Sequence, residues 1–598
     1  MISISKKGLK PLPGLKKQTY LKGAAILVVA NLTVKIIGAI FKIPLANILH
    51  EEGMALFSTA YNLYAMLFVI ATAGLPVAVS KMVSESLAKN NHGEVKRIFS
   101  IAFLMLSFLG IIGMLVLLFG AKKLAVSVGS PDSYLAIIAI APAIFFVAAL
   151  SAFRGYFQGH SNMIPTAVSE VIEALGKLII GLALSYIFMQ EKFGGSYMKA
   201  AGGAVFGVTG GALGALIVMW ASYIILNKKS SSIPFKADLE KRSRKKIFTT
   251  LLLLAIPITI GAAVTSLTNV IDMAMIRQRL QTITVTDSIY NMLTSFYGLT
   301  DADVIRGAFL NTKASDVLYG AYTGYAIPLF NLPPTIVMAL SLSIVPAISS
   351  AYALKNYSSI KTLTESTLRI TIMFSVPCAV GLSVLASPIL ITLYNNARSE
   401  SLLFILAYAV ITVCLVSVTT AILQATGKVM LPVKNMLIGG LVKIITNYIF
   451  IAIPSINIGG APITTNICYL IIAILNICDI MKITKIKFSI SDFILKPFIS
   501  AFVMGAGAYF SYNLVAGILN APTICLSFSF VSQNVPITPL TSTVRFGVII
   551  AMGVSIIVAV ILYAIMLFAT KSVKKDDILM LPKGEMLAKI LDKWHLIS

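Results

Sequence analysis

Apolar segments long enough to cross a bilayer recur along the whole length of this 598-residue chain. A helix needs about 20 consecutive apolar residues to span the hydrocarbon core, and the sequence contains about fourteen such segments. Backbone polar groups in a bilayer must be satisfied within the segment itself, and a helix does this. The sequence therefore predicts an all-α polytopic membrane protein. The expected spans are 23–47, 55–80, 98–120, 134–157, 165–189, 204–226, 248–276, 316–349, 367–394, 402–425, 432–453, 462–482, 496–516 and 544–570.

Charge is scarce and is distributed by side of the membrane. Charged residues make up 12% of the chain, yet the formal net charge is +25. So high a positive charge is typical of nucleic-acid-binding proteins. Here, however, the Lys and Arg residues gather in short loops on alternate sides of the membrane, as the positive-inside rule predicts. We therefore expect no nucleic-acid partner. The same rule places both termini in the cytoplasm, with the protein in the plasma membrane and no cleavable signal before the first span.

The first span carries two lysines on one face. At 100° per residue, Asn31, Lys35, Gly38 and Lys42 fall within about 60° of one another. An ammonium near the bilayer centre costs about 2.5 kcal/mol or more, so it normally faces protein or a water-filled cavity. We interpret this stripe as the wall of a cavity for an anionic ligand, bound by Asn31, Lys35 and Lys42. Because Lys42 is close to the helix end, the alternative interpretation is that its ammonium snorkels to the membrane interface.

The fourth and fifth spans add charged candidates. Arg154 is a further anion ligand because guanidinium pairs bidentately with phosphate oxygens, its alternative partners being Glu170 or a lipid phosphate. Glu170, Glu173 and Lys177 share one face of the fifth span. A structural ion pair between Glu173 and Lys177 is the simpler interpretation, and proton or cation coupling is the alternative.

Matched segments indicate a six-helix duplication. The second and eighth spans both end with Pro followed by Ser at an inner edge, and the fourth and tenth are both followed by Pro and then Lys (Pro76, Pro165 and Lys177; Pro346, Pro432 and Lys443). Repeats of this kind are typical of transporters whose halves rock about a central site.

The duplication makes the seventh span the partner of the first. Gly261, Thr265, Asn269 and Asp272 again fall on one face, within about 80°. Asp272 is either the counter-ion of a basic cavity residue or a sodium ligand together with Asn269 and Thr265.

We expect five parts along the chain. They are an N-terminal lobe (1–226), a basic cytoplasmic linker (227–247), a C-terminal lobe (248–482), two further helices (483–570) and a cytoplasmic amphipathic tail (571–598). The long outer loop 277–315 contains a candidate short interfacial helix at 288–297.

Several stretches resemble the stage V sporulation protein B (SpoVB/YtgP) group. They are FKIPLANILHEEGMALFSTAYNLYAMLFVIATAGLPVAVSKMVSE, FRGYFQG, EVIEALGKL and YGAYTGYAIPLFNLPPTIVMALSLSIVPAIS. That group belongs to the multidrug/oligosaccharidyl-lipid/polysaccharide (MOP) flippase superfamily, with MATE transporters and MurJ. The resemblance implies two six-helix lobes plus two helices. It also implies export of undecaprenyl-pyrophosphate-linked, lipid II-like sugar precursors, with Lys35 and Lys42 in places comparable to the cationic residues thought to hold the pyrophosphate.

The leading hypothesis is a non-enzymatic flippase, acting as a monomer on a lipid-linked oligosaccharide within membrane lipids. One alternative is an ion-coupled exporter of organic cations with the same fold, which would need carboxylates in the cavity. The other is a membrane glycosyltransferase or ligase using the acidic residues of loop 277–315. The five cysteines lie singly and no His/Cys cluster occurs, so we expect no metal site and no cofactor, with Na⁺ or H⁺ coupling left open.

Overall fold

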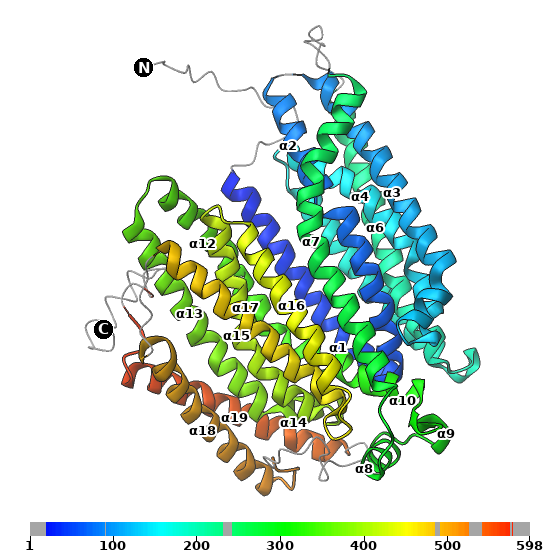
Figure 1. Ribbon diagram of the computed structural model, residues 1–598, viewed down its shortest axis with the longest axis vertical. Helices are drawn as coiled ribbons and strands as arrows, with labels where there is room; N and C mark the ends of the chain where they lie inside the picture. The colour runs from blue at the N-terminus through cyan, green and yellow to red at the C-terminus, as the bar shows by residue number, and fades with distance from the viewer. Residues whose placement is uncertain are drawn as a thin grey trace. The chain divides into compact units, whose positions relative to one another are not determined.

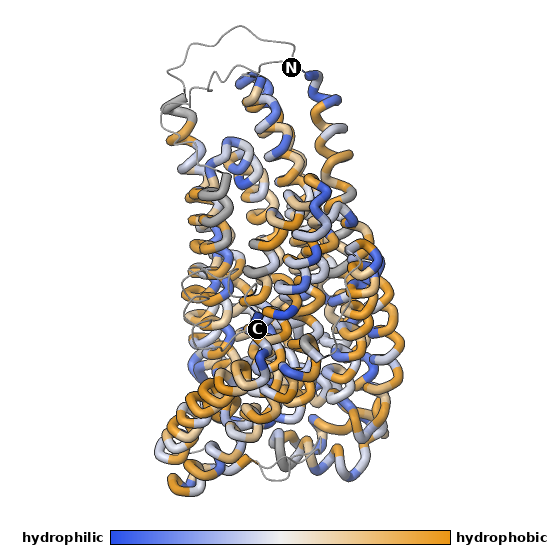
Figure 2. The backbone as a smooth tube through the Cα atoms, turned by 90° about the vertical axis from the view of Figure 1, so that its left-hand side faces the viewer, coloured by the Kyte–Doolittle hydropathy of each residue, from blue (hydrophilic) through white to orange (hydrophobic). Residues whose placement is uncertain are grey.

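The protein is almost entirely helical wherever the computed structural model describes it, namely at residues 20–89, 91–230, 242–484, 491–524, 541–574 and 577 (Figure 1). Every expected span overlaps a helix, which confirms the all-α prediction. Within the described residues, ten helical stretches are long and apolar enough to cross a membrane, so the number of fourteen spans stays a prediction. Figure 2 shows apolar residues along most of the helices, interrupted by hydrophilic positions.

The chain divides into two compact units. It passes from one unit to the other within two long helices, α1 (Tyr20–Thr72) and α7 (Arg244–Leu280). The first unit comprises the chain up to Leu49 and Leu56–Val270, and the second comprises His50–Ala55 and Ile271–Ser598. Helix α1 (Tyr20–Thr72) is broken at His50, where φ is 51° and ψ is −168°. The expected first two spans thus meet at a break rather than a loop.

After α1, five helices and the first part of a sixth, α7, belong to the first unit, and α7 continues past Val270 into the second unit. Their bounds are α2 Leu75–Ala88, α3 His92–Ser127, α4 Tyr134–Gly159, α5 Ile164–Met189, α6 Tyr197–Ser230 and α7 Arg244–Leu280, with 3₁₀ turns at Pro131–Ser133 and Glu191–Phe193. Local sequence sets several ends. Asn91 caps α3 by accepting from the Glu94 amide at 3.0 Å, and Pro165 occupies the first turn of α5, where its missing N–H costs nothing.

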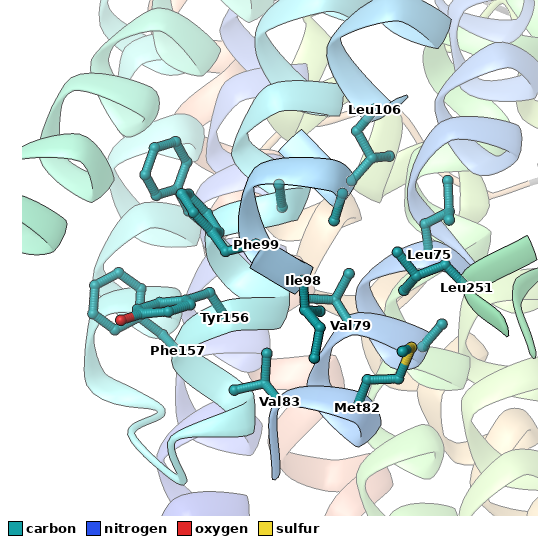
Figure 3. Close-up of a cluster of buried hydrophobic side chains, with 14 of the residues drawn as sticks. Leu75, Val79, Met82, Val83, Ile98, Phe99, Leu106, Tyr156, Phe157 and Leu251 are labelled. Carbon is teal, nitrogen blue, oxygen red and sulfur yellow. The ribbon is translucent and has the colours of Figure 1, made fainter. Parts of the chain in front are cut away.

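An apolar core joins α2, α3, α4 and α7 (Figure 3). Val79 of α2, Ile98 of α3, Phe157 of α4 and Leu251 of α7 are all buried in it. Within a bilayer such side chains stabilise the fold through close van der Waals packing rather than through removal from water. This core fixes the end of α4 that carries Arg154.

Helices α5 and α6 pack backbone to backbone through glycines. A Cβ added to Gly176 would lie 2.4 Å from the Gly211 Cα, and one added to Gly207 would lie 2.6 Å from the Gly181 Cα. Gly207 and Gly211, four residues apart on one face of α6, therefore form a small-residue helix–helix contact, as is typical within membranes.

Replacing Gly211 with Ala is expected to lower the thermal stability of the purified protein. The new Cβ would lie 2.3 Å from the Glu173 carbonyl oxygen, so α5 must move, and overpacking of this kind costs about 1–3 kcal/mol. Gly214→Ala is the matched control, because its Cβ would make an ordinary 3.6 Å contact with Ile172. Equal melting temperatures for the two variants would contradict this account of the packing.

The second unit contains the remaining elements. Their bounds are α8 Asp287–Asn291, α9 Asp301–Val304, β1 Ile305–Arg306, β2 Phe309–Leu310, α10 Thr312–Gly320, α11 Ile327–Phe330, α12 Leu332–Ala353, α13 Tyr357–Val384, α14 Ala386–Tyr394, α15 Glu400–Ala425, α16 Met430–Phe450, α17 Gly460–Thr484, α18 Lys496–Ile518 and α19 Ser542–Ala569, with π-helical turns at Met292–Phe296, Ala321–Ala326 and Ser491–Leu495 and a 3₁₀ turn at Asn457–Gly459. Strands β1 and β2 form an antiparallel hairpin. Helices α18 and α19 pack side by side (Figure 1).

The loop 277–315 is ordered by its own polar contacts. The short helix expected at 288–297 is present as α8 and the π turn after it. Asp301 accepts from the Tyr290 hydroxyl. Asp303 accepts from the Thr300 hydroxyl at 2.7 Å and pairs with Lys313 at 3.2 Å. The Thr300 hydrogen bond, with help from Lys313, lowers the pKa of the Asp303 carboxyl. These carboxylates therefore act as structural partners within the loop. Most of the expected tail (571–598) and of the linker (227–247) lies outside the described residues.

Candidate functional site

A cavity of about 380 Å³ lies inside the first unit, between α1, α4, α5 and α6. Its volume is in the range of small-molecule sites, about 300–1,000 Å³. It brings together most of the predicted site residues from three different helices, namely Asn31, Lys35, Arg154, Glu170, Glu173 and Lys177. The rest of its wall is largely apolar and includes the rings of Phe41, Tyr61, Tyr64 and Phe68.

The α1 stripe faces this cavity as the periodicity predicts. Asn31, Lys35 and Gly38 all line it. A Cβ on Gly38 would meet nothing within 4 Å, so the glycine leaves open space between the lysine and the opposite wall. Lys42, one turn farther along the stripe, is half-buried and is not among the lining residues. The structure therefore separates the two lysines, with Lys35 at the cavity.

Arg154 is held by two residues of α5. Its Nη2 is 2.9 Å from Glu173 Oε2, and its Nε donates to Ser169 Oγ at 3.2 Å. Ser169 and Glu173 are one helical turn apart, which matches the planar fork of a guanidinium. Among the described residues, the ion-pair partner of Arg154 is thus Glu173 rather than Glu170.

The predicted ion pair between Glu173 and Lys177 is wrong. The Glu173 carboxylate points to Arg154, while the Lys177 ammonium lies over the rings of Tyr61, Phe41 and Phe57, at 4.3, 5.0 and 5.9 Å from their centroids. A cation over aromatic faces gains about 0.5–2 kcal/mol, more when it is desolvated. Spacing on α5 alone could not reveal this, because the competing partners belong to α1 and α4.

Charge in the cavity is unbalanced. Lys35, Arg154 and Lys177 face Glu170 and Glu173, so cations outnumber carboxylates three to two among the lining residues. Glu170 contributes a buried oxygen, Oε2, that has no hydrogen-bond partner within the described part of the chain. Coulomb interactions are stronger at such a low-dielectric site than in water. The arrangement suits a ligand that is anionic overall and also carries hydrogen-bond donors.

The second unit holds a separate polar cluster around Asp272. The Lys443 ammonium is 2.8 Å from Asp272 Oδ2, and Asn447 donates to Oδ1. Thr464 in turn donates to the Asn447 carbonyl oxygen. Both carboxylate oxygens are therefore engaged, which favours the counter-ion alternative over the sodium alternative for Asp272. Asn269 is exposed and belongs to the part of α7 that groups with the first unit.

The sequence hypothesis did not include Lys443 among the site residues. The signal was present, because the duplication matches Lys443 with Lys177. The two related lysines have different partners: aromatic rings for Lys177 and a carboxylate for Lys443.

Comparisons with known proteins agree with this architecture. A family model described as "Polysaccharide biosynthesis protein" matches residues 20–352, and one described as "Lipid II flippase MurJ" matches residues 309–528. In Bacillus subtilis (strain 168), stage V sporulation protein B is 27% identical over 482 residues, covering 80% of this chain and 87% of that protein. The lipid II flippase MurJ of the same organism is 26% identical over 472 residues, covering 75% and 80%.

Solved structures share the fold. The lipid II flippase MurJ in its inward closed conformation aligns with a TM-score of 0.60 at 15% identity, covering 91% of this chain and 99% of that one. An inward-facing multidrug resistance MATE transporter of the MOP superfamily aligns with a TM-score of 0.56 at 14% identity, covering 77% and 98%. These proteins are described as flippases and transporters, in agreement with the expectation of a non-enzyme. Since the first family model covers more than half of the chain, the protein belongs to the polysaccharide biosynthesis protein family and has the membrane fold of the MOP superfamily.

Proposed function

We propose that this protein flips an undecaprenyl-pyrophosphate-linked sugar precursor of the cell wall from the inner to the outer leaflet by alternating access. The observation that carries the proposal is the cavity of the first unit, with its excess of cations on an otherwise apolar wall. The relative named as a lipid II flippase supports the same substrate class.

The pyrophosphate binds Lys35 and Arg154 in this proposal. Charge-assisted hydrogen bonds of this kind are about twice as strong as neutral ones. Arg154 exchanges its bond with Glu173 for one with a phosphate oxygen, and Lys42 extends the cationic stripe about two turns beyond Lys35. The undecaprenyl chain stays in the surrounding lipid, so the cavity needs to hold only the head group.

The membrane potential drives the export step. Moving one charge across 100 mV is worth about 2.3 kcal/mol, so a head group with two net negative charges leaving a negative interior gains about 4–5 kcal/mol. We place the protein in the plasma membrane as a monomer, with both termini cytoplasmic and the two six-helix lobes rocking about the site. The distribution of basic loops supports the cytoplasmic position of the termini, and the internal duplication supports the rocking of the lobes.

Replacing Lys35 with Gln is expected to slow translocation of a lipid-linked sugar in liposomes about tenfold or more, because a hydrogen bond to a charged group contributes about 1.5–3 kcal/mol. The measurement is the accessibility of a fluorescent lipid-linked sugar on the two faces of proteoliposomes. Lys123→Gln, an equal loss of charge at an exposed lysine of α3 that does not line the cavity, is the matched control. Equal rates for the parent protein and Lys35→Gln would refute the cationic-cavity model.

A further inference from the structure

A row of four aromatic rings runs along the second half of α1. Phe57, Tyr61, Tyr64 and Phe68 follow at steps of four, three and four residues, so they share one helix face. Their ring centroids are 5.8, 5.9 and 5.6 Å apart in that order. Tyr61, Tyr64 and Phe68 line the same cavity as Lys35 and Arg154.

Burial in the fold and contact with the Lys177 ammonium explain the positions of only some of these four rings. Phe57 is buried, and Phe57 and Tyr61 also contact the Lys177 ammonium. Phe68 is only partly buried, lies at the far end from Lys177, and pairs with Tyr64. An aromatic ring that lines an otherwise charged cavity presents a flat apolar surface to the ligand.

A buried acceptor lies in the same cavity. Glu170 Oε2 has no hydrogen-bond partner among the described residues, and such buried polar atoms in native proteins usually require one. Asn31 adds an amide, which both donates and accepts. The cavity therefore combines flat apolar faces and hydrogen-bonding groups with its cations.

Sugars require this combination. The C–H bonds of a pyranose form an apolar face that packs against aromatic rings, and its hydroxyls donate to carboxylates and amides at the edge. Tyr61 and Phe68 are seven residues apart, which is about 10 Å along a helix and long enough to hold one sugar ring.

We propose that Tyr61, Tyr64 and Phe68 form a carbohydrate subsite. A pyranose of the head group stacks on these rings and donates a hydroxyl hydrogen bond to Glu170. The subsite rests on the proposed function, since it takes the sugar next to the pyrophosphate that Lys35 and Arg154 bind. It assigns recognition of the sugar to α1 and α5, separately from recognition of the charge.

The test compares two lipids in the same proteoliposomes, one carrying a monosaccharide on undecaprenyl pyrophosphate and the other carrying undecaprenyl pyrophosphate alone. Phe68→Leu is expected to slow the sugar-bearing lipid about two- to tenfold relative to the sugar-free lipid, because an aromatic contact of this kind is worth that much in rate. Phe68→Tyr, which keeps the ring, should restore the parent ratio. Lys35→Gln should slow both lipids alike.

The matched control is Phe146→Leu, which removes a similarly half-buried ring, paired with Phe145 at 5.5 Å, from a place outside the cavity. An unchanged ratio in Phe68→Leu, or the same ratio in Phe146→Leu, would overturn the carbohydrate subsite while leaving the flippase proposal intact. A parent protein that moves neither lipid would overturn both proposals.

Discussion

Replacing Arg154 with Gln is expected to reduce transport of the lipid-linked sugar about a hundredfold. The change removes a cation that lines the cavity and leaves the Glu173 carboxylate without its 2.9 Å partner. Truncating one member of a buried, hydrogen-bonded charge pair costs about 2–5 kcal/mol, and the two remaining carboxylates then repel an anionic head group. The transport rate of Arg154→Lys should lie between those of the parent protein and Arg154→Gln, because an ammonium keeps the charge but loses the fork that reaches both Ser169 and Glu173.

A double variant separates binding from support of the fold. If Arg154 serves only to satisfy Glu173, then Arg154→Gln combined with Glu173→Gln should restore both the melting temperature and the transport rate. We expect the melting temperature to recover and the transport rate to stay low, because the phosphate ligand is still missing. Transport at the parent rate in the double variant would contradict the role of Arg154 as a ligand.

Much of the cavity could be predicted from the sequence because it depends on single helices. Hydropathy places the spans, and a 100° rotation per residue puts Asn31 and Lys35 on one face of α1, where the structure has them lining the cavity. The positions of Glu170 and Lys177 on α5 follow from the same rule. Each of these inferences needs only the period of a helix and the cost of a charge in lipid.

The pairing of the charges could not be predicted in the same way. Spacing on α5 suggested that Glu173 and Lys177 pair, but each has a stronger partner on another helix, Arg154 for the first and the α1 rings for the second. Those choices depend on which helices are adjacent, which periodicity does not state. Internal duplication is the one sequence signal that reaches across helices, and it identified Lys443 as the relative of Lys177.

The break in α1 has a similar explanation. Hydropathy separates two spans at 48–54 but does not show that Glu51 is buried, with its carboxylate 3.4 Å from the Arg398 guanidinium. A Cβ on Gly320 would lie 1.7 Å from the Glu51 carbonyl oxygen. The break therefore depends on a glycine about 270 residues away in the sequence, within the same compact unit.

The second large effect is expected at Asp272. Asp272→Asn should lower the melting temperature of the purified protein strongly, because it leaves the Lys443 ammonium buried without its counter-ion. That side chain is 14% exposed in the pair, and breaking such a pair from one side costs about 3–5 kcal/mol. Lys443→Met should be about as harmful, since it removes the counter-ion of the partly buried carboxylate and leaves it with the neutral donor Asn447.

The double variant Asp272→Asn with Lys443→Met removes both charges together and should recover most of the lost stability, as replacement of a buried pair by neutral groups often does. Strict additivity of the two single effects would contradict coupling between these residues.

The contacts of Asp272 also predict how transport depends on ions. Since Lys443 and Asn447 occupy both oxygens of Asp272, replacing Na⁺ by K⁺ should leave transport by the parent protein unchanged within about twofold. A sodium requirement that disappears in Asp272→Asn would instead restore the sodium-ligand interpretation of this carboxylate.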